Sequence, residues 1–140
     1  MKYIGIDTGV NTGFAIWDSK SKELLEVSTL KLHQALLRIH ELKQQETPMK
    51  VIFEDPRQRK WIPREQSLSE QLGRRQGAGS VKRDAKVWQE FCEDLHIPYA
   101  MVKPAKGMTK WSEDYFKKIT GWTKRTSEHG RDAACLVFGR

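Results

Sequence analysis

Four residues of types that bind divalent metals stand where a fold could gather them. Asp7 and Glu54 each end a short apolar run and are each followed by a loop. His129 and Asp132 are three residues apart at the start of a predicted C-terminal helix, so their side chains share one helical face. Open α/β sheets build their sites at the carboxyl ends of strands. If the first and fourth strands are neighbours, Asp7 and Glu54 converge. The C-terminal helix carries apolar Ala133, Leu136 and Val137, so we expect it to pack on the sheet and to bring His129 and Asp132 towards the two carboxylates.

Such a cluster favours a bound cation. Ionised carboxylates without partners repel one another, and a divalent metal removes that conflict. Oxygen-dominated ligand sets suit Mg²⁺ or Mn²⁺, and an imidazole moves the preference somewhat towards Mn²⁺. Two ions about 3.5–4 Å apart can activate a water and stabilise the leaving oxygen of a phosphoryl displacement. Structural interpretations stay open: Asp7 and Asp132 as turn or cap residues, Glu54 as a strand end, and His129 as a surface residue.

Positive charge is concentrated in two windows of the chain. The 140 residues carry 25 Lys and Arg against 18 Asp and Glu, a net charge of +7. Residues 57–86 hold nine basic and three acidic side chains, and residues 103–125 hold seven and two, so the remainder is net negative. Segregated positive charge is typical of a protein that neutralises phosphates. A solvated basic surface without a partner is the alternative.

Length and composition predict one domain over residues 1–140. No run of about 18 apolar residues occurs, which excludes a transmembrane helix. The N-terminal residues lack the apolar core of a signal peptide, and Cys92 and Cys135 stand far apart without a zinc-binding motif. We expect a cytoplasmic protein with no membrane contact.

The elements that must position these residues alternate between strand and helix. Residues 2–7 and 14–18 flank a Gly- and Asn-rich turn over 8–13, which predicts a β-hairpin. Three glycines at 73, 77 and 79 indicate close packing or an interruption in the long second helix. The further predicted strands cover 23–28, 50–54 and 97–102, and the predicted helices cover 30–43, 67–95, 109–119 and 127–138. This order predicts an α/β domain with a mixed sheet and flanking helices.

Four segments resemble, in order, the motifs of the RuvC-type Holliday junction resolvases of the RNase H-like superfamily. The first is Ile4-Gly5-Ile6-Asp7-Thr8-Gly9 with Thr12-Gly13-Phe14-Ala15 on the return strand, and the second is Val51-Ile52-Phe53-Glu54. The others are Leu72-Gly73-Arg74-Arg75-Gln76-Gly77-Ala78 and His129-Gly130-Arg131-Asp132-Ala133-Ala134. The match covers the chain from residue 4 to its C-terminal end, and its specificity lies in the order of the four motifs.

The resemblance implies an RNase H-like mixed sheet with three antiparallel first strands, and metal-dependent endonuclease cleavage of four-way DNA junctions in recombination, repair or phage DNA processing. Asp7, Glu54 and Asp132 would bind Mg²⁺, with Mn²⁺ as a substitute and two ions per site. His129 would be a fourth ligand or would act on the attacking water. Lys103 and Lys110 would stabilise charge at the scissile phosphate.

A branched DNA partner is expected to contact the basic windows and the loop around Trp61, where the family carries an aromatic residue that stacks into the opened junction. The expected DNA-binding residues are Arg57, Arg59, Lys60, Trp61, Arg64, Arg74, Arg75, Lys82, Arg83 and Lys106. Symmetric cutting of two strands implies a homodimer, and the family's interface would be the helix over 67–95. The gene would be prokaryotic or phage-encoded.

Three departures and three alternatives remain. His129 stands where the family more often has a carboxylate, the segment after Glu54 is Arg-rich, and the chain given ends soon after Phe138. Another RNase H-like nuclease, acting on flaps or RNA–DNA hybrids, would use the same chemistry. An actin-like or sugar-kinase-like ATP-binding domain has a similar opening hairpin but is normally built from two such domains. Non-catalytic DNA binding is the third alternative.

Overall fold

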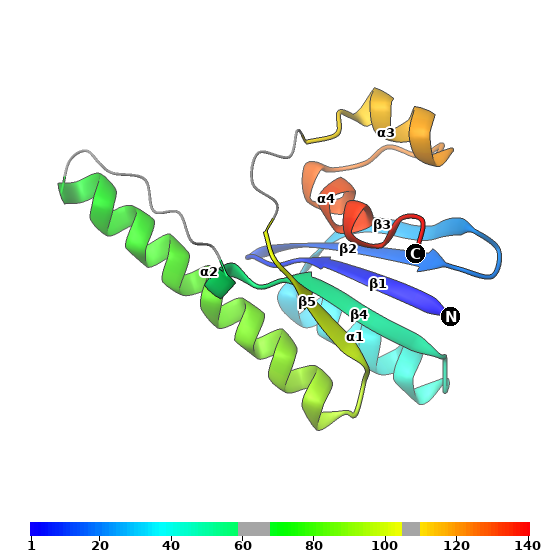
Figure 1. Cartoon of the computed structure of the whole chain (residues 1–140), viewed down its shortest axis with the longest axis horizontal. Coiled ribbons are helices and arrows are strands. Elements are labelled where there is room, and N and C mark those ends of the chain that lie inside the picture. The colour runs from blue at the N-terminus through cyan, green and yellow to red at the C-terminus, as the bar shows by residue number, and fades with distance from the viewer. Residues whose placement is uncertain (59–67, 105–109) are drawn as a thin grey trace.

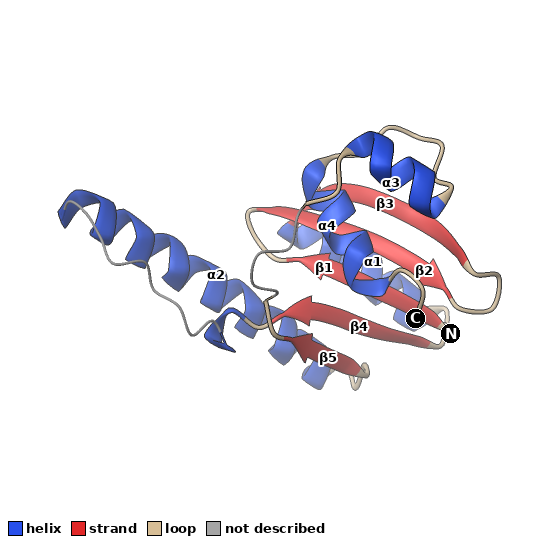
Figure 2. Cartoon of the chain, turned by 45° about the horizontal axis from the view of Figure 1, so that its top comes forward, coloured by secondary structure: helices blue, strands red, loops and turns tan. Residues whose placement is uncertain are grey.

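A mixed five-stranded sheet forms the centre of the protein (Figures 1 and 2). The computed structural model describes residues 1–58, 68–104 and 110–140, with the backbone alone at 58, 68–78 and 81. The strands lie in the order β3-β2-β1-β4-β5, with the first three antiparallel and both β4 and β5 parallel to β1. Their bounds are β1 Lys2–Asp7, β2 Asn11–Asp18, β3 Glu23–Lys31, β4 Met49–Glu54 and β5 Tyr99–Val102.

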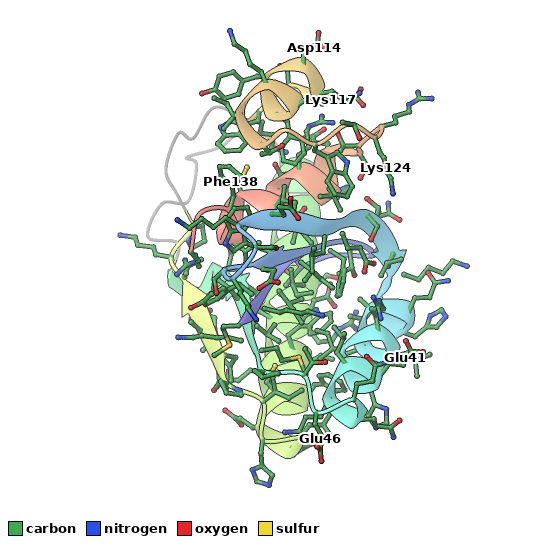
Figure 3. The ribbon with its side chains drawn as sticks, turned by 90° about the vertical axis from the view of Figure 1, so that its right-hand side faces the viewer. Glu41, Glu46, Asp114, Lys117, Lys124 and Phe138 are labelled. Atoms are coloured by element: carbon green, nitrogen blue, oxygen red, sulfur yellow. The ribbon has the colours of Figure 1, made fainter. Side chains whose placement is uncertain are left out.

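Helices cover both faces of this sheet. The helices α1 and α2 lie on one face and α3 and α4 on the other (Figure 3), where Glu41 marks the α1 side and Asp114 the α3 side. The first half of α2 extends past the sheet (Figure 1). The bounds are α1 Leu32–Gln44, the 3₁₀ turn η1 Pro56–Gln58, α2 Leu68–Asp94, α3 Glu113–Thr120 and α4 Glu128–Val137.

At the Asp7 end of β1 and β2, the two faces of the sheet carry residues of different size. Ile4, Ile6, Phe14, Ile16, Val51 and Phe53 fill the core under α1 and α2. The α4 face carries Gly5, Gly13 and Ala15 at the alternate positions. Because strand residues alternate between faces, the pattern follows directly from the sequence of β1 and β2. Small residues on one side let α4 approach the backbone closely.

Several predicted boundaries are corrected by backbone pairing. The predicted turn over 8–13 is shorter, since Asn11, Thr12 and Gly13 pair with β3 as part of β2. Leu30, predicted to open the first helix, pairs with Thr12 instead, so β3 continues to Lys31. A side chain that suits a helix face also suits a half-buried strand, and the available partner strand decides.

The later elements also shift. The glycines do not interrupt α2, which runs continuously over 68–94, and an added Cβ at Gly79 would meet no atom within 4 Å. Residue 67, where this helix was predicted to begin, lies outside the described residues. The helix predicted over 109–119 begins at Glu113, because Ser112 caps it, and it ends at Gly121 in the left-handed conformation (φ 75°). The last strand begins at Tyr99.

No helix within the described ranges has both the length and the apolar character needed to cross a membrane.

Candidate functional site

Asp7 and His129 form the central contact of the candidate site. Asp7 is the last residue of β1, and its side chain lies on the same sheet face as Gly5, the face covered by α4. His129 is the second residue of α4, and its Nδ1 lies 2.8 Å from Asp7 Oδ2. Residues 122 positions apart are thus joined at the sheet edge, as the strand-end and helix-start positions predicted.

Two features place the first turn of α4 beside Asp7: the absence of a side chain at Gly13 and the N-cap of the helix. Gly13 pairs with Asp7 across the hairpin, and a Cβ added there would overlap the His129 carbonyl group. The Ser127 hydroxyl caps the helix by accepting the Gly130 N–H at 3.1 Å, and it also hydrogen-bonds to the Thr29 hydroxyl. The cap and the close approach fix where His129 stands.

Asp132 shares the helix face of His129 and contacts a lysine. Lys110 Nζ lies 3.5 Å from Asp132 Oδ2 and donates a hydrogen bond to Glu128. The backbone beside Lys110 is held down, because Arg131 Nε donates to the Trp111 carbonyl at 2.9 Å. The Lys110 ammonium therefore forms ion pairs with two carboxylates in the first turns of α4.

The electrostatics of the site follow from these contacts. Burial raises the pKa of Asp7, and the negative charge of Asp132 adds to this rise, while the hydrogen bond with His129 opposes it. The hydrogen bond to Glu128 raises the pKa of Lys110, with Asp132 contributing, and lowers the pKa of Glu128. An additional positive charge near Asp7 and Asp132 would therefore be favoured.

Glu54 ends β4, the parallel neighbour of β1, and Lys103 follows the end of β5, the next strand of the sheet. Ile6 pairs with Phe53, so Asp7 and Glu54 occupy the following positions of two parallel neighbours. Glu54 alternates with Ile52 and so lies on the α4 face of the sheet. It also pairs with Val102, after which the exposed Lys103 leaves β5. The predicted meeting of strand ends is confirmed for the backbone.

A buried acid next to Glu54 was missed by sequence reasoning. Asp55 is 5% exposed and accepts hydrogen bonds from the Arg57 backbone N–H at 3.1 Å and from Arg57 Nε at 2.8 Å. Arg57 Nη2 also lies 3.1 Å from Gln89 Oε1 on α2. Arg57, expected to contact DNA, thus ties the end of β4 to α2. The Asp-Pro-Arg spacing typical of a side-chain turn was the available signal.

The remaining predicted DNA contacts are spread over α2 and two undescribed segments. Lys82 and Arg83 are exposed on α2, and Arg74 and Arg75 belong to its first half, where the backbone alone is described. The other five, Arg59, Lys60, Trp61, Arg64 and Lys106, lie outside the described residues.

No family model and no curated protein matches this chain. Across residues 1–58, 68–104 and 110–140, no three His, Cys, Asp or Glu side chains are grouped closely enough to hold a metal ion by themselves. The contacts found are those of Asp7 with His129 and of Asp132 with Lys110.

Proposed function

We propose that this protein is a metal-dependent endonuclease with an RNase H-like fold, which cuts four-way DNA junctions. The carrying observation is the contact of Asp7 with His129 at the sheet edge where β1 and β4 end. It joins the first and last motifs of the resemblance to the RuvC-type resolvases. Glu54 ends β4, beside the end of β1 that carries Asp7, and Asp132 lies on the same face of α4 as His129.

The sheet supports the fold assignment. Its first three strands form an antiparallel meander, and β4 and β5 add in parallel on the other side of β1. This agrees with the mixed sheet that the resemblance implies. The element order also agrees, since three strands precede the first helix and two helices follow the last strand.

The donor set fits a hard divalent cation. Asp7 and Asp132 are each 27% exposed, so water and ions reach both. Burial, with the negative charge of Asp132, raises the pKa of Asp7, and a bound cation would favour its ionised form. Asp7, Glu54, Asp132 and His129 would hold Mg²⁺ or Mn²⁺. When bound, the metal supplies an activated water and charge stabilisation for the leaving oxygen.

Other contacts of the chain would orient the His129 imidazole and neutralise the charge of the DNA phosphates. The contact between Asp7 and His129 Nδ1 fixes the imidazole ring, which leaves Nε2 as the nitrogen that can face a metal or a water. Lys110 has its ammonium beside Asp132, and exposed Lys103 follows the β5 residue that pairs with Glu54, so both lysines would attract the scissile phosphate. Exposed Lys82 and Arg83 on α2 extend the positive surface for the arms of a junction. A homodimer would place two such sites on the two strands to be cut.

A substrate panel tests the proposal. The protein is incubated in Mg²⁺ with a four-way junction, a flap and an RNA–DNA hybrid. We expect paired symmetric nicks in the junction and no cutting when the metal is chelated. Asp7→Asn should lose cleavage but keep junction binding, while Asp114→Asn on the exposed surface of α3 should keep both.

Each other outcome has a defined meaning. Preferred cutting of the flap or the hybrid would assign the alternative RNase H-like activity. Cleavage unaffected by Asp7→Asn would contradict the site. No metal-dependent cutting of any of the three substrates would contradict the nuclease.

A further inference from the structure

Lys110 stands between two carboxylates of different character. Asp132 is 27% exposed and belongs to the proposed metal ligands, while Glu128 is 55% exposed and lies four residues earlier on α4. Lys110 Nζ hydrogen-bonds to Glu128 and lies 3.5 Å from Asp132 Oδ2. Glu128 was not among the residues predicted from the sequence.

We infer that Glu128 is a positioning residue that shares the Lys110 ammonium with Asp132 and so weakens the pairing of this lysine with Asp132, which can then bind a divalent cation. This inference rests on the proposed function. A lysine ammonium and a metal ion compete for the same carboxylate oxygens, because either one compensates the negative charge. Glu128 gives the ammonium a second partner on the outer side of the site.

The segment that carries Lys110 is fixed beside the start of α4, so the lysine stays close to Asp132. Arg131 Nε donates to the carbonyl of Trp111, and Arg131 Nη1 donates to Thr126 Oγ1 at 3.0 Å. These bonds tie the backbone next to Lys110 to the start of α4, within reach of both carboxylates. The ammonium is therefore shared between Glu128 and Asp132, and removing Glu128 leaves Asp132 as its partner.

The same arrangement keeps the lysine available to a substrate. Lys110 is 64% exposed, so its ammonium faces solvent while it rests on Glu128. Because Glu128 shares the ammonium with Asp132, a phosphate arriving at the metal would meet a positive charge that is not paired with Asp132 alone. By positioning the Lys110 ammonium, Glu128 would thus favour both metal binding and phosphate binding without contacting either group.

Metal binding without any DNA tests the inference. The affinity for Mn²⁺ alone is measured by electron paramagnetic resonance at low ionic strength, in wild type, Glu128→Gln, Lys110→Met and the double variant. Glu90→Gln is the matched control, since Glu90 is an exposed carboxylate paired with Lys86 on α2. Thermal denaturation establishes that each variant is folded.

We expect Glu128→Gln to weaken Mn²⁺ binding about two- to fivefold, the range of an exposed ion pair. Lys110→Met should not weaken binding, and in that background Glu128→Gln should have no further effect. The control should match wild type. Equal affinity in Glu128→Gln and wild type overturns the inference, as does an undiminished effect in the Lys110→Met background, which would mean that Glu128 acts on the metal directly. No Mn²⁺ binding by wild type overturns the proposed function as well.

Discussion

Gly13→Ala should displace the site without removing any of its functional side chains. Gly13 lies on the α4 face of β2, opposite Asp7 in the hairpin. A Cβ at this position would lie 2.6 Å from the carbonyl carbon of His129 and 2.8 Å from Asp7 Cβ. Both contacts involve residues of the proposed site, and the first is with backbone, which cannot rotate away.

The size of the effect follows from the overlap. Carbon atoms that are not bonded pack at about 3.5–4.0 Å, so the start of α4 must move by about 1 Å. A misplacement of that size costs roughly 10²-fold in rate when it separates catalytic groups. Overpacking of this kind costs about 1–3 kcal/mol, which would lower Tm by roughly 3–12 °C in a chain of this length.

The assay combines single-turnover junction cleavage with thermal denaturation. Gly79→Ala is the matched control, because a Cβ there meets nothing within 4 Å and the residue lies inside α2. Alanine should stabilise that helix by about 0.5–1 kcal/mol. The same substitution should thus lower stability at position 13 and raise it at position 79. A Gly13→Ala protein with wild-type Tm and cleavage rate would refute the close approach of α4.

Three further predictions concern charge and burial. Asp7→Asn should raise the Tm of the metal-free protein at neutral pH, because burial and the negative charge of Asp132 disfavour the ionised carboxyl. Because its folded pKa is raised, Asp7 does not lower the stability below the unfolded pKa near 3.8, and it lowers the stability increasingly as the pH rises through the folded pKa. The Tm difference between variant and wild type should therefore vanish in acid. A difference that grew in acid would contradict this reasoning. Arg57→Ala should destabilise the protein by about 1–3 kcal/mol in urea unfolding, because it removes an ion pair and hydrogen bonds of buried Asp55, whereas exposed Lys82→Ala should change stability by less than about 0.5 kcal/mol. Burial raises the pKa of Cys92 to about 12 and of Cys135 to about 11, so mass spectrometry should show alkylation by iodoacetamide at pH 7.5 after unfolding only; rapid labelling of the native protein would contradict this.

The strand-end acids were predictable because they depend on local pattern and one general rule. Asp7 and Glu54 follow apolar runs that read as strands, and the parallel pairing of β1 with β4 brings those ends together. His129 and Asp132 were predictable as a pair from their spacing on a helix. Contact between the two groups needed a further step, the docking of α4, which the apolar residues of that helix indicated.

The partners of the charged residues were not predictable. Arg57 and Lys110 belong to the basic windows, and net charge treats them alike as phosphate contacts. The structure commits Arg57 to Asp55 and Gln89, and Lys110 to Glu128 and Asp132. The contact between Arg57 and Asp55 depends on a turn of three residues. The other contacts join segments far apart in the sequence, which meet only when the elements pack together. A count of charges carries no information about either.

At the Asp7 end of β1 and β2, the difference in residue size between the two sheet faces explains how α4 packs on the sheet and also reaches a polar site. Ile4 and Ile6 bury bulk under α1 and α2, where close packing supplies stability. Gly5 and Gly13, on the opposite face, forgo that burial and let the α4 backbone lie against β1 and β2. Only this close approach brings a side chain as short as that of Asp7 within 2.8 Å of the helix's histidine. Larger residues at 5 and 13 would overlap the backbone carbonyl groups of Ala133 and His129, so α4 would have to move away from the sheet and the two halves of the site would separate. The two glycines therefore forgo side-chain burial at this end of the sheet and permit the contact between Asp7 and His129.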